Sequence, residues 1–117
     1  MKFVSLLSFL IVSLSVQAQI VFDDYFVDRT MRFDFMLAGN STTTKVYPVS
    51  FREEPFWGGS LVNLTDPFGY GNFRYEVFDD STRTLLYSRG FCTLYQEWQT
   101  TAEARQMERV FHEVATF

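Results

Sequence analysis

The sequence contains only one cysteine, Cys92, and one histidine, His112. A lone cysteine cannot form an internal disulfide, so a folded domain of this chain must be stabilised by its hydrophobic core. A catalytic zinc ion needs three protein ligands, ordinarily drawn from His, Cys and carboxylates, and this chain offers few of the first two. From the residues alone we predict no catalytic site, no metal site and no cofactor. We expect Cys92 to be a small buried residue, with a reactive or intermolecular thiol as the alternative.

Basic residues are also in the minority, with 10 Lys and Arg against 14 Asp and Glu and a formal net charge of −4. Nucleic-acid binding depends on clustered Lys and Arg, and no basic stripe is present in the sequence. This composition argues against a nucleic-acid partner.

The N-terminus has the pattern of a signal peptide. A short positive start, Met1–Lys2, precedes an apolar run over residues 3–16 and the small-x-small sequence Val16-Gln17-Ala18. A transmembrane helix is the alternative, but the run is broken by serines and is shorter than the ~20 apolar residues that span a bilayer. We therefore predict cleavage after Ala18, no membrane span afterwards, and export to the periplasm, cell surface or exterior.

Period-two alternation is typical of half-buried strands and is the main structural signal in the remaining residues. Residues 31–37 place Phe33 and Phe35 on one face and Arg32 and Asp34 on the other. The segment 73–98 predicts a hairpin, with strands over 73–79 and 84–88 joined by a polar turn. Further strands are predicted over 45–51, where Pro48 indicates a sheet edge or a bulge, and over 61–64.

The sequence at the end of the chain does not distinguish a helix from a strand. Residues 99–104 are expected to form a single turn, and residues 105–114 are compatible with either a helix or a final strand. Closely spaced strands joined by Gly, Pro and Asn turns predict one all-β domain over residues 19–117, an antiparallel β-sandwich of about six to seven short strands. The residues expected to anchor its core are Phe33, Phe35, Tyr75, Val77, Leu85 and Trp98.

Loop aromatics supply a candidate binding surface. Trp57, Phe68 and Tyr70 lie in glycine-containing loops, and the carboxylates Glu53 and Glu54 lie close to Trp57 in the sequence. Exposed rings beside polar groups would suit a sugar ligand, whereas buried rings would close the ends of the core. We favour the second interpretation.

Two other groups of residues resemble metal sites. Asp23, Asp24 and Asp28 suggest calcium, but they lack the alternating oxygen ligands of a dedicated loop, so a solvated turn is favoured. The run from His112 to Thr116 begins like the zinc motif His-Glu-x-x-His, but Thr116 replaces the second histidine. We interpret His112 as an ordinary residue at the end of a strand.

Several short motifs, in this order, resemble one family. They are Phe22-Asp23-Asp24-Tyr25-Phe26, Met31–Phe35 followed by Ala38-Gly39-Asn40, Trp57-Gly58-Gly59, Phe91–Trp98, and Thr101-Ala102-Glu103-Ala104. Together they resemble the N-terminal domain of secreted immunoglobulin-A-peptidase-like zinc metallopeptidases. The resemblance implies a β-sandwich that precedes a zinc peptidase domain, which these 117 residues do not contain, and it implies a closing strand over residues 105–114.

The expected function is that of a non-catalytic exported accessory domain. Its implied partners are a metallopeptidase domain, in the same chain in the family, or a protein substrate. The alternative is a free-standing adhesion or carbohydrate-binding module that uses the loop aromatics to hold a glycan.

Overall fold

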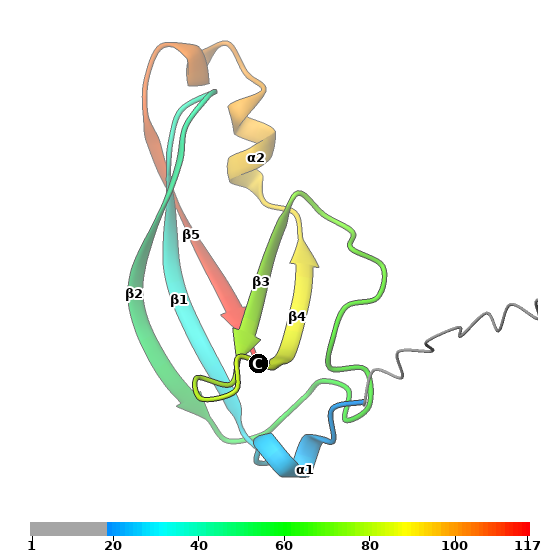
Figure 1. The fold of residues 1–117 in the computed structure, drawn as a ribbon. Helices are drawn as coiled ribbons and strands as arrows, with labels where there is room; N and C mark the ends of the chain where they lie inside the picture. Colours follow the sequence, from blue (N-terminus) through cyan, green and yellow to red (C-terminus); the bar gives the residue numbers. More distant parts are fainter. Residues whose placement is uncertain (1–18) are drawn as a thin grey trace, which may run out of the picture.

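The computed structural model describes residues 19–117, so the predicted signal peptide lies outside the described residues. The fold is mostly β, with five strands in two antiparallel sheets over the described range. One sheet has the order β2-β1-β5 and the other is the hairpin β3-β4 (Figure 1). The strand bounds are Thr30–Gly39 (β1), Thr44–Glu54 (β2), Phe73–Phe78 (β3), Leu85–Phe91 (β4) and Arg109–Thr116 (β5). The helices are α1 (Phe22–Tyr25), α2 (Leu94–Gln99) and the 3-10 helix η1 (Glu103–Arg105).

The central strand β1 confirms the alternation seen in the sequence. Phe35 and Leu37 are buried in the core, whereas Arg32 and Asp34 lie together on the opposite face of the sheet. β1 pairs with β2 on one side and with β5 on the other, so both strand pairs of the three-stranded sheet include β1.

The expectation that Pro48 lies at a sheet edge or at a bulge is also confirmed, and both descriptions apply. β2 is the edge strand of its sheet, and the β1–β2 register shifts between Asp34, which faces Ser50, and Phe35, which faces Pro48. Val49 is thus the extra residue of a bulge. An edge and a bulge both tolerate a residue without an amide hydrogen.

The predicted hairpin is present, and Asp79 organises its turn. The Asp79 amide donates to Thr84 O at 2.9 Å, and its carboxylate accepts bonds from the Thr82 amide at 2.7 Å and the Ser81 hydroxyl at 2.7 Å. The Thr82 hydroxyl also donates to this carboxylate and has the largest effect on it. Together these bonds lower the pKa of Asp79 to about 2. Asp and Ser favour turns for this reason, since their side chains bond to nearby backbone groups.

The two sheets enclose an aromatic core. One cluster joins Phe35 and Leu37 to Tyr95 and Trp98, and a second joins Phe22 and Leu64 to Tyr87. Among the six expected anchors, Phe35 and Trp98 are buried. The other four are partly buried, namely Phe33, Tyr75, Val77 and Leu85. Burial raises the pKa of Tyr75 to about 12, so its phenol stays protonated and donates to Thr116 O at 2.8 Å.

A short helix that we did not predict closes one end of the core. In α2, Thr93 caps the N-terminus by accepting a bond from the Gln96 amide at 3.0 Å. Six residues are too few for a stable isolated helix, so α2 depends on burying Tyr95 and Trp98. The Tyr95 hydroxyl donates to Thr43 O at 2.8 Å, which ties the helix to the β1–β2 turn.

Three expectations about elements were wrong in whole or in part. Residues 61–64 form no strand, because the Ser60 hydroxyl accepts bonds from the Val62 and Asn63 amides and folds the segment into a turn. The final strand spans 109–116, and the start of the predicted range lies in η1 and a turn. The described residues therefore contain five strands, fewer than the six to seven expected.

Cys92 is exposed, and the expectation that it is buried was wrong. It lies in the extended segment between β4 and α2, where Phe91 is partly buried and Thr93 is buried. Because consecutive side chains of an extended chain point in opposite directions, Cys92 points to solvent.

Candidate functional site

One apolar surface of the described residues lies on strand β2, on the core-side face of the β2-β1-β5 sheet. Val46 pairs with the buried Leu37, and Phe51 pairs with Phe33, so both β2 side chains lie on the core-side face. Yet Val46 is 56% exposed and Phe51 is 61% exposed. We call Val46, Pro48 and Phe51 the apolar strip.

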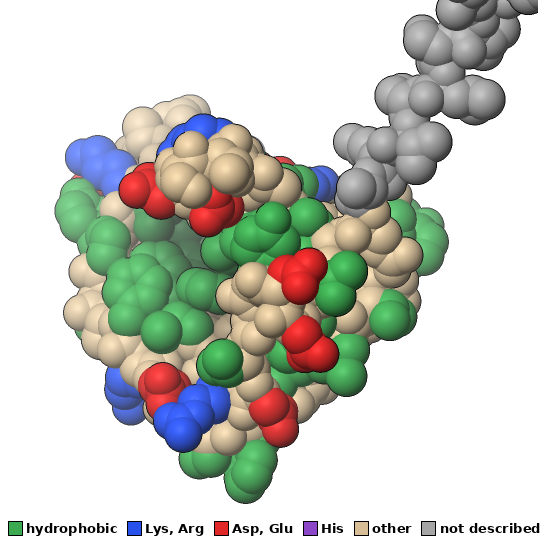
Figure 2. All heavy atoms as spheres, turned by 60° about the horizontal axis from the view of Figure 1, so that its bottom comes forward, with side chains coloured by type: hydrophobic (Ala, Val, Ile, Leu, Met, Phe, Trp, Pro, Cys, Tyr) green, Lys and Arg blue, Asp and Glu red, His purple; other side chains and the backbone are tan. Residues whose placement is uncertain are grey.

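The apolar strip continues into the core through its aromatic end. Phe51 stacks on Phe33 with ring centroids 4.5 Å apart, and Phe33 stacks on the buried Phe35 at 5.1 Å. Figure 2 shows a hollow lined by hydrophobic side chains on its left, the side on which Figure 1 places β2. The strip is therefore anchored to the core and only partly covered by it.

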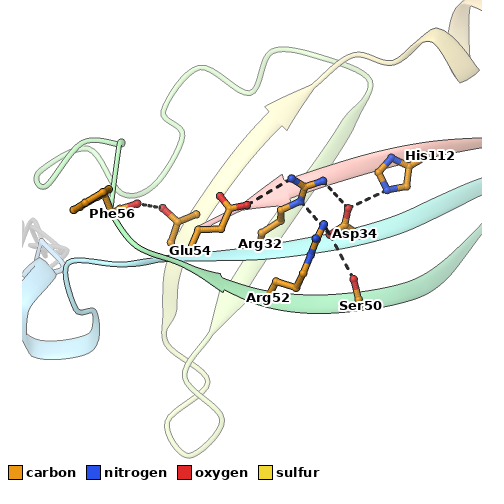
Figure 3. A network of polar contacts seen from close by, with 8 residues as sticks. Arg32, Asp34, Ser50, Arg52, Glu54, Phe56 and His112 are labelled. Carbon is orange, nitrogen blue, oxygen red and sulfur yellow. Dashed lines mark hydrogen bonds and ion pairs between the residues drawn. The ribbon is translucent and has the colours of Figure 1, made fainter.

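The opposite face of the same sheet carries a polar network centred on Asp34 (Figure 3). Arg32 makes two bonds to the carboxylate, at 2.9 and 3.1 Å, and Arg52 makes one at 3.1 Å. His112 Nε2 lies 3.0 Å from Asp34 Oδ1. We call these residues, together with Ser50, the Asp34 network.

The electrostatics of the Asp34 network keep Asp34 ionised. Its side chain is buried, with only 3% of the residue exposed, which would favour the neutral acid. The hydrogen bond from Arg32 outweighs this desolvation, and with Arg52 it holds the pKa of Asp34 well below its ordinary value. Its contacts with Arg32, Arg52, His112 and Ser50 give the network the character of a structural ion cluster.

The expected loop surface is divided by the structure into separate parts. Trp57 packs into the second core cluster, where its ring lies 5.7 Å from that of Tyr87 and its Nε1 donates to Ser60 O at 3.2 Å. Glu53 forms an ion pair with Arg29, and Glu54 lies 3.5 Å from Arg32. Trp57 thus closes one end of the core, as the favoured interpretation held.

For Phe68 and Tyr70 the favoured interpretation, that these rings close the core, was wrong, because both rings stand in solvent. They are 71% and 76% exposed, and they stack on each other with centroids 5.6 Å apart. Asp66 holds the loop beneath them. Its Oδ1 accepts bonds from the Phe68 and Gly69 amides, at 2.9 and 3.4 Å, and its Oδ2 accepts one from the Gly90 amide at 3.0 Å. These bonds lower the pKa of Asp66, and the bond from the Phe68 amide has the largest effect.

A small pocket of about 350 Å³ lies beside Trp57. It brings Asp23 and Asp28 next to the indole, an arrangement that sequence spacing did not reveal. Asp28 also accepts a bond from the Trp57 amide at 3.3 Å, so one of its oxygens has a structural role. A larger groove of about 960 Å³ runs between residues 19–25 and 62–67.

The described residues offer no metal centre of the familiar kind. Across residues 19–117, no group of three or more His, Cys, Asp and Glu side chains is arranged to hold a metal ion. His112 lies within β5 and pairs across the sheet with Met36, and its ring contacts Asp34. No helix in this same part of the chain has the length and hydrophobicity to cross a membrane.

Sequence reasoning missed the Asp34 network, because its members come from three strands whose register is set by long-range pairing. One signal was available for Arg32, which alternates with Met31 and Phe33 as an outward-facing strand residue does, whereas Arg52 and His112 are each followed by a glutamate and gave no such signal. The exposure of the apolar strip had no such signal, since Val46 and Phe51 have the pattern of buried strand residues.

Comparison with known proteins identifies the family. A family model described as Peptidase M64 N-terminus matches residues 21–117, the whole of the two-sheet fold. No curated protein matches the chain. Because the family match covers most of the sequence, this protein belongs to the family of peptidase M64 N-terminal domains, which is the immunoglobulin-A-peptidase-like family that its motifs resemble.

Proposed function

We propose that residues 19–117 form a non-catalytic accessory domain, folded as a small β-sandwich, that packs beside a zinc peptidase domain or contacts its protein substrate. The observation that carries this proposal is the apolar strip. Large side chains exposed together on one face of a monomer mark a surface that another protein covers. Family membership supplies the class of partner, since the matched domain is the N-terminus of a peptidase.

The place of action follows from the N-terminal sequence. Residues 1–18 have the composition of a cleaved secretory signal, and the fold holds together without a disulfide. We propose that the domain works outside the cytoplasm, in the periplasm, at the cell surface or beyond it.

The alternative proposal, a free-standing glycan-binding or adhesion module, has less support. A sugar site needs an open aromatic face beside free hydrogen-bonding groups. Trp57 is packed against Tyr87, and the Asp66 carboxylate beneath the exposed Phe68 and Tyr70 is already bonded to three backbone amides. These contacts leave few free hydrogen-bonding groups beside the loop aromatics, which argues against a sugar site there.

The test uses the chain from Gln19 to Phe117 and a zinc peptidase domain of the M64 family. We expect the two proteins to bind each other in isothermal titration calorimetry. We also expect the chain alone to leave casein intact and to retain no stoichiometric zinc after dialysis. Cleavage of casein that is lost on treatment with a chelator would overturn the non-catalytic role. The absence of binding to the peptidase domain would overturn the proposal that the chain packs beside that domain.

A further inference from the structure

We infer that the apolar strip forms the docking site for the peptidase domain. This inference rests on the proposed function and names the surface that performs it. Three features of the described residues support it: the form of the edge strand, the position of the C-terminus, and the contrast between the two faces of the sheet.

The edge of β2 is unsuited to receiving another strand, whereas its core-side face is open. Pro48 lacks an amide donor, and the bulge at Val49 interrupts the regular ladder. Natural sheets use proline and bulges in this way to prevent edge-to-edge pairing. The apolar side chains of Val46 and Phe51 nevertheless stand in solvent beside that protected edge. A partner therefore meets side chains here, and not a free backbone edge.

The end of the chain lies next to the aromatic end of the strip. Phe117 and Met31 exchange two backbone hydrogen bonds, of 3.0 and 2.7 Å, and Ala115 pairs directly with Phe33. Phe33 in turn stacks on Phe51. A domain joined after Phe117 thus begins one strand away from the strip. Such tethering would place the partner at a high effective concentration beside the strip.

The two faces of the sheet differ in what they offer a partner. On the outer face, the Asp34 network bonds its own charged groups to one another, and covering it would desolvate them with no new partner gained. On the core-side face, Phe51 presents an aromatic ring already ordered by stacking on Phe33. Ordered aromatic residues are typical anchors of protein interfaces. The partner surface that fits this site is an apolar projection of the peptidase domain.

The experiment compares variants of the two faces in the same strand. Phe51→Ser removes the ring at the aromatic end of the strip, and Val46→Lys places a charge at an exposed position that can accept it. Tyr47→Ser is the matched control, since Tyr47 is 51% exposed but pairs with Met36, one residue out of step with Leu37 and hence on the outer face. Titration calorimetry against the M64 zinc peptidase domain gives Kd, and circular dichroism with the thermal midpoint reports folding.

We expect Phe51→Ser and Val46→Lys to raise Kd by at least about tenfold and Tyr47→Ser to leave it within about twofold. If the parent binds and all three variants bind equally well, the inference is overturned while the proposed function stands. The same holds if Tyr47→Ser weakens binding as much as Phe51→Ser. If the parent chain does not bind, the proposed function itself fails. Should Phe51→Ser unfold, Val46→Lys alone decides between these outcomes.

Discussion

Trp98 links the helix α2 to the core, so its removal gives the most direct test of the fold. Its ring lies 5.9 Å from Tyr95 and 5.6 Å from Phe111, and its Nε1 donates to Glu103 at 2.6 Å. Truncation to alanine removes a large buried ring, and such substitutions cost about 3–5 kcal/mol. The whole free energy of unfolding of a small domain is about 5–15 kcal/mol, so Trp98→Ala should lose a large part of it.

Two further variants separate packing from hydrogen bonding. Trp98→Phe keeps an aromatic ring but removes the indole donor, so it should destabilise less than Trp98→Ala. It should also raise the pKa of Glu103, because the bond from Trp98 is the main cause that lowers it. Leu94→Ala is the matched control in the same helix. Leu94 is exposed, so this change should stay within about 0.5 kcal/mol.

Urea unfolding followed by circular dichroism measures these differences. Since α2 has only six residues, we also expect its amides to exchange faster with solvent in Trp98→Ala. A Trp98→Ala variant that unfolds at the urea concentration of the parent would refute the assignment of Trp98 as an anchor. Equal effects of Trp98→Ala and Leu94→Ala would refute it as well.

Four shorter predictions follow from single contacts. The pKa of Asp34 in the folded protein lies below the ordinary value of 3.8, so its ionised form stabilises the fold above that pH and the stabilisation is lost as pH falls. Between about pH 5 and pH 3, Asp34→Asn should therefore lose less stability than the parent. Equal losses in the two proteins would contradict this prediction. Asp66→Ala should speed amide exchange at Phe68, Gly69 and Gly90, and unchanged protection would show that Asp66 does not hold the loop. Cys92 should react with a thiol reagent in the folded protein, whereas reaction only in denaturant would restore the buried assignment. Gly39→Ala should lower the thermal midpoint, because Gly39 has φ +145° and an added Cβ would lie 2.1 Å from Thr43 O; an unchanged midpoint would count against that strain.

The strands were predictable where local alternation decides the structure. Residues 31–37 and 73–79 carry an unbroken period of two, and the structure contains both strands. Pro48 also carried enough information to indicate the edge and the bulge. These features depend on backbone geometry and on near neighbours in the sequence, which is why the residues alone reveal them.

Helix α2 was missed although its capping signal is present. Thr93 is followed three residues later by Gln96, which is the spacing of a capping box, and the structure contains the bond from the Gln96 amide to the Thr93 hydroxyl. The long aromatic run that ends at Trp98 suggested a strand terminus instead. Propensity does not distinguish these outcomes for six residues, and the tertiary contacts of Tyr95 and Trp98 decide between them.

Both surfaces discussed above depend on register, which sequence alone does not determine. Asp34, Arg52 and His112 meet because β1 pairs with β2 and β5 at particular offsets. The exposure of Val46 and Phe51 depends on how far the β3-β4 hairpin extends across the sheet. Each is a property of long-range packing, so residues with the same local pattern, such as Phe35 and Phe51, have opposite exposures.

The two faces of β2 differ in chemistry, and both depend on the register of the sheet. Pro48 and the bulge protect the edge against pairing with other chains, so the exposed apolar strip does not become a template for aggregation. The Asp34 network holds the outer face in a fixed register, because a one-residue slip of β2 would move Arg52 to the core side and Phe51 to the outside. The same ion cluster therefore keeps Phe51 on the core-side face of the sheet. Under the proposed docking, the orientation of the binding residues on one face thus depends on polar pairing on the other.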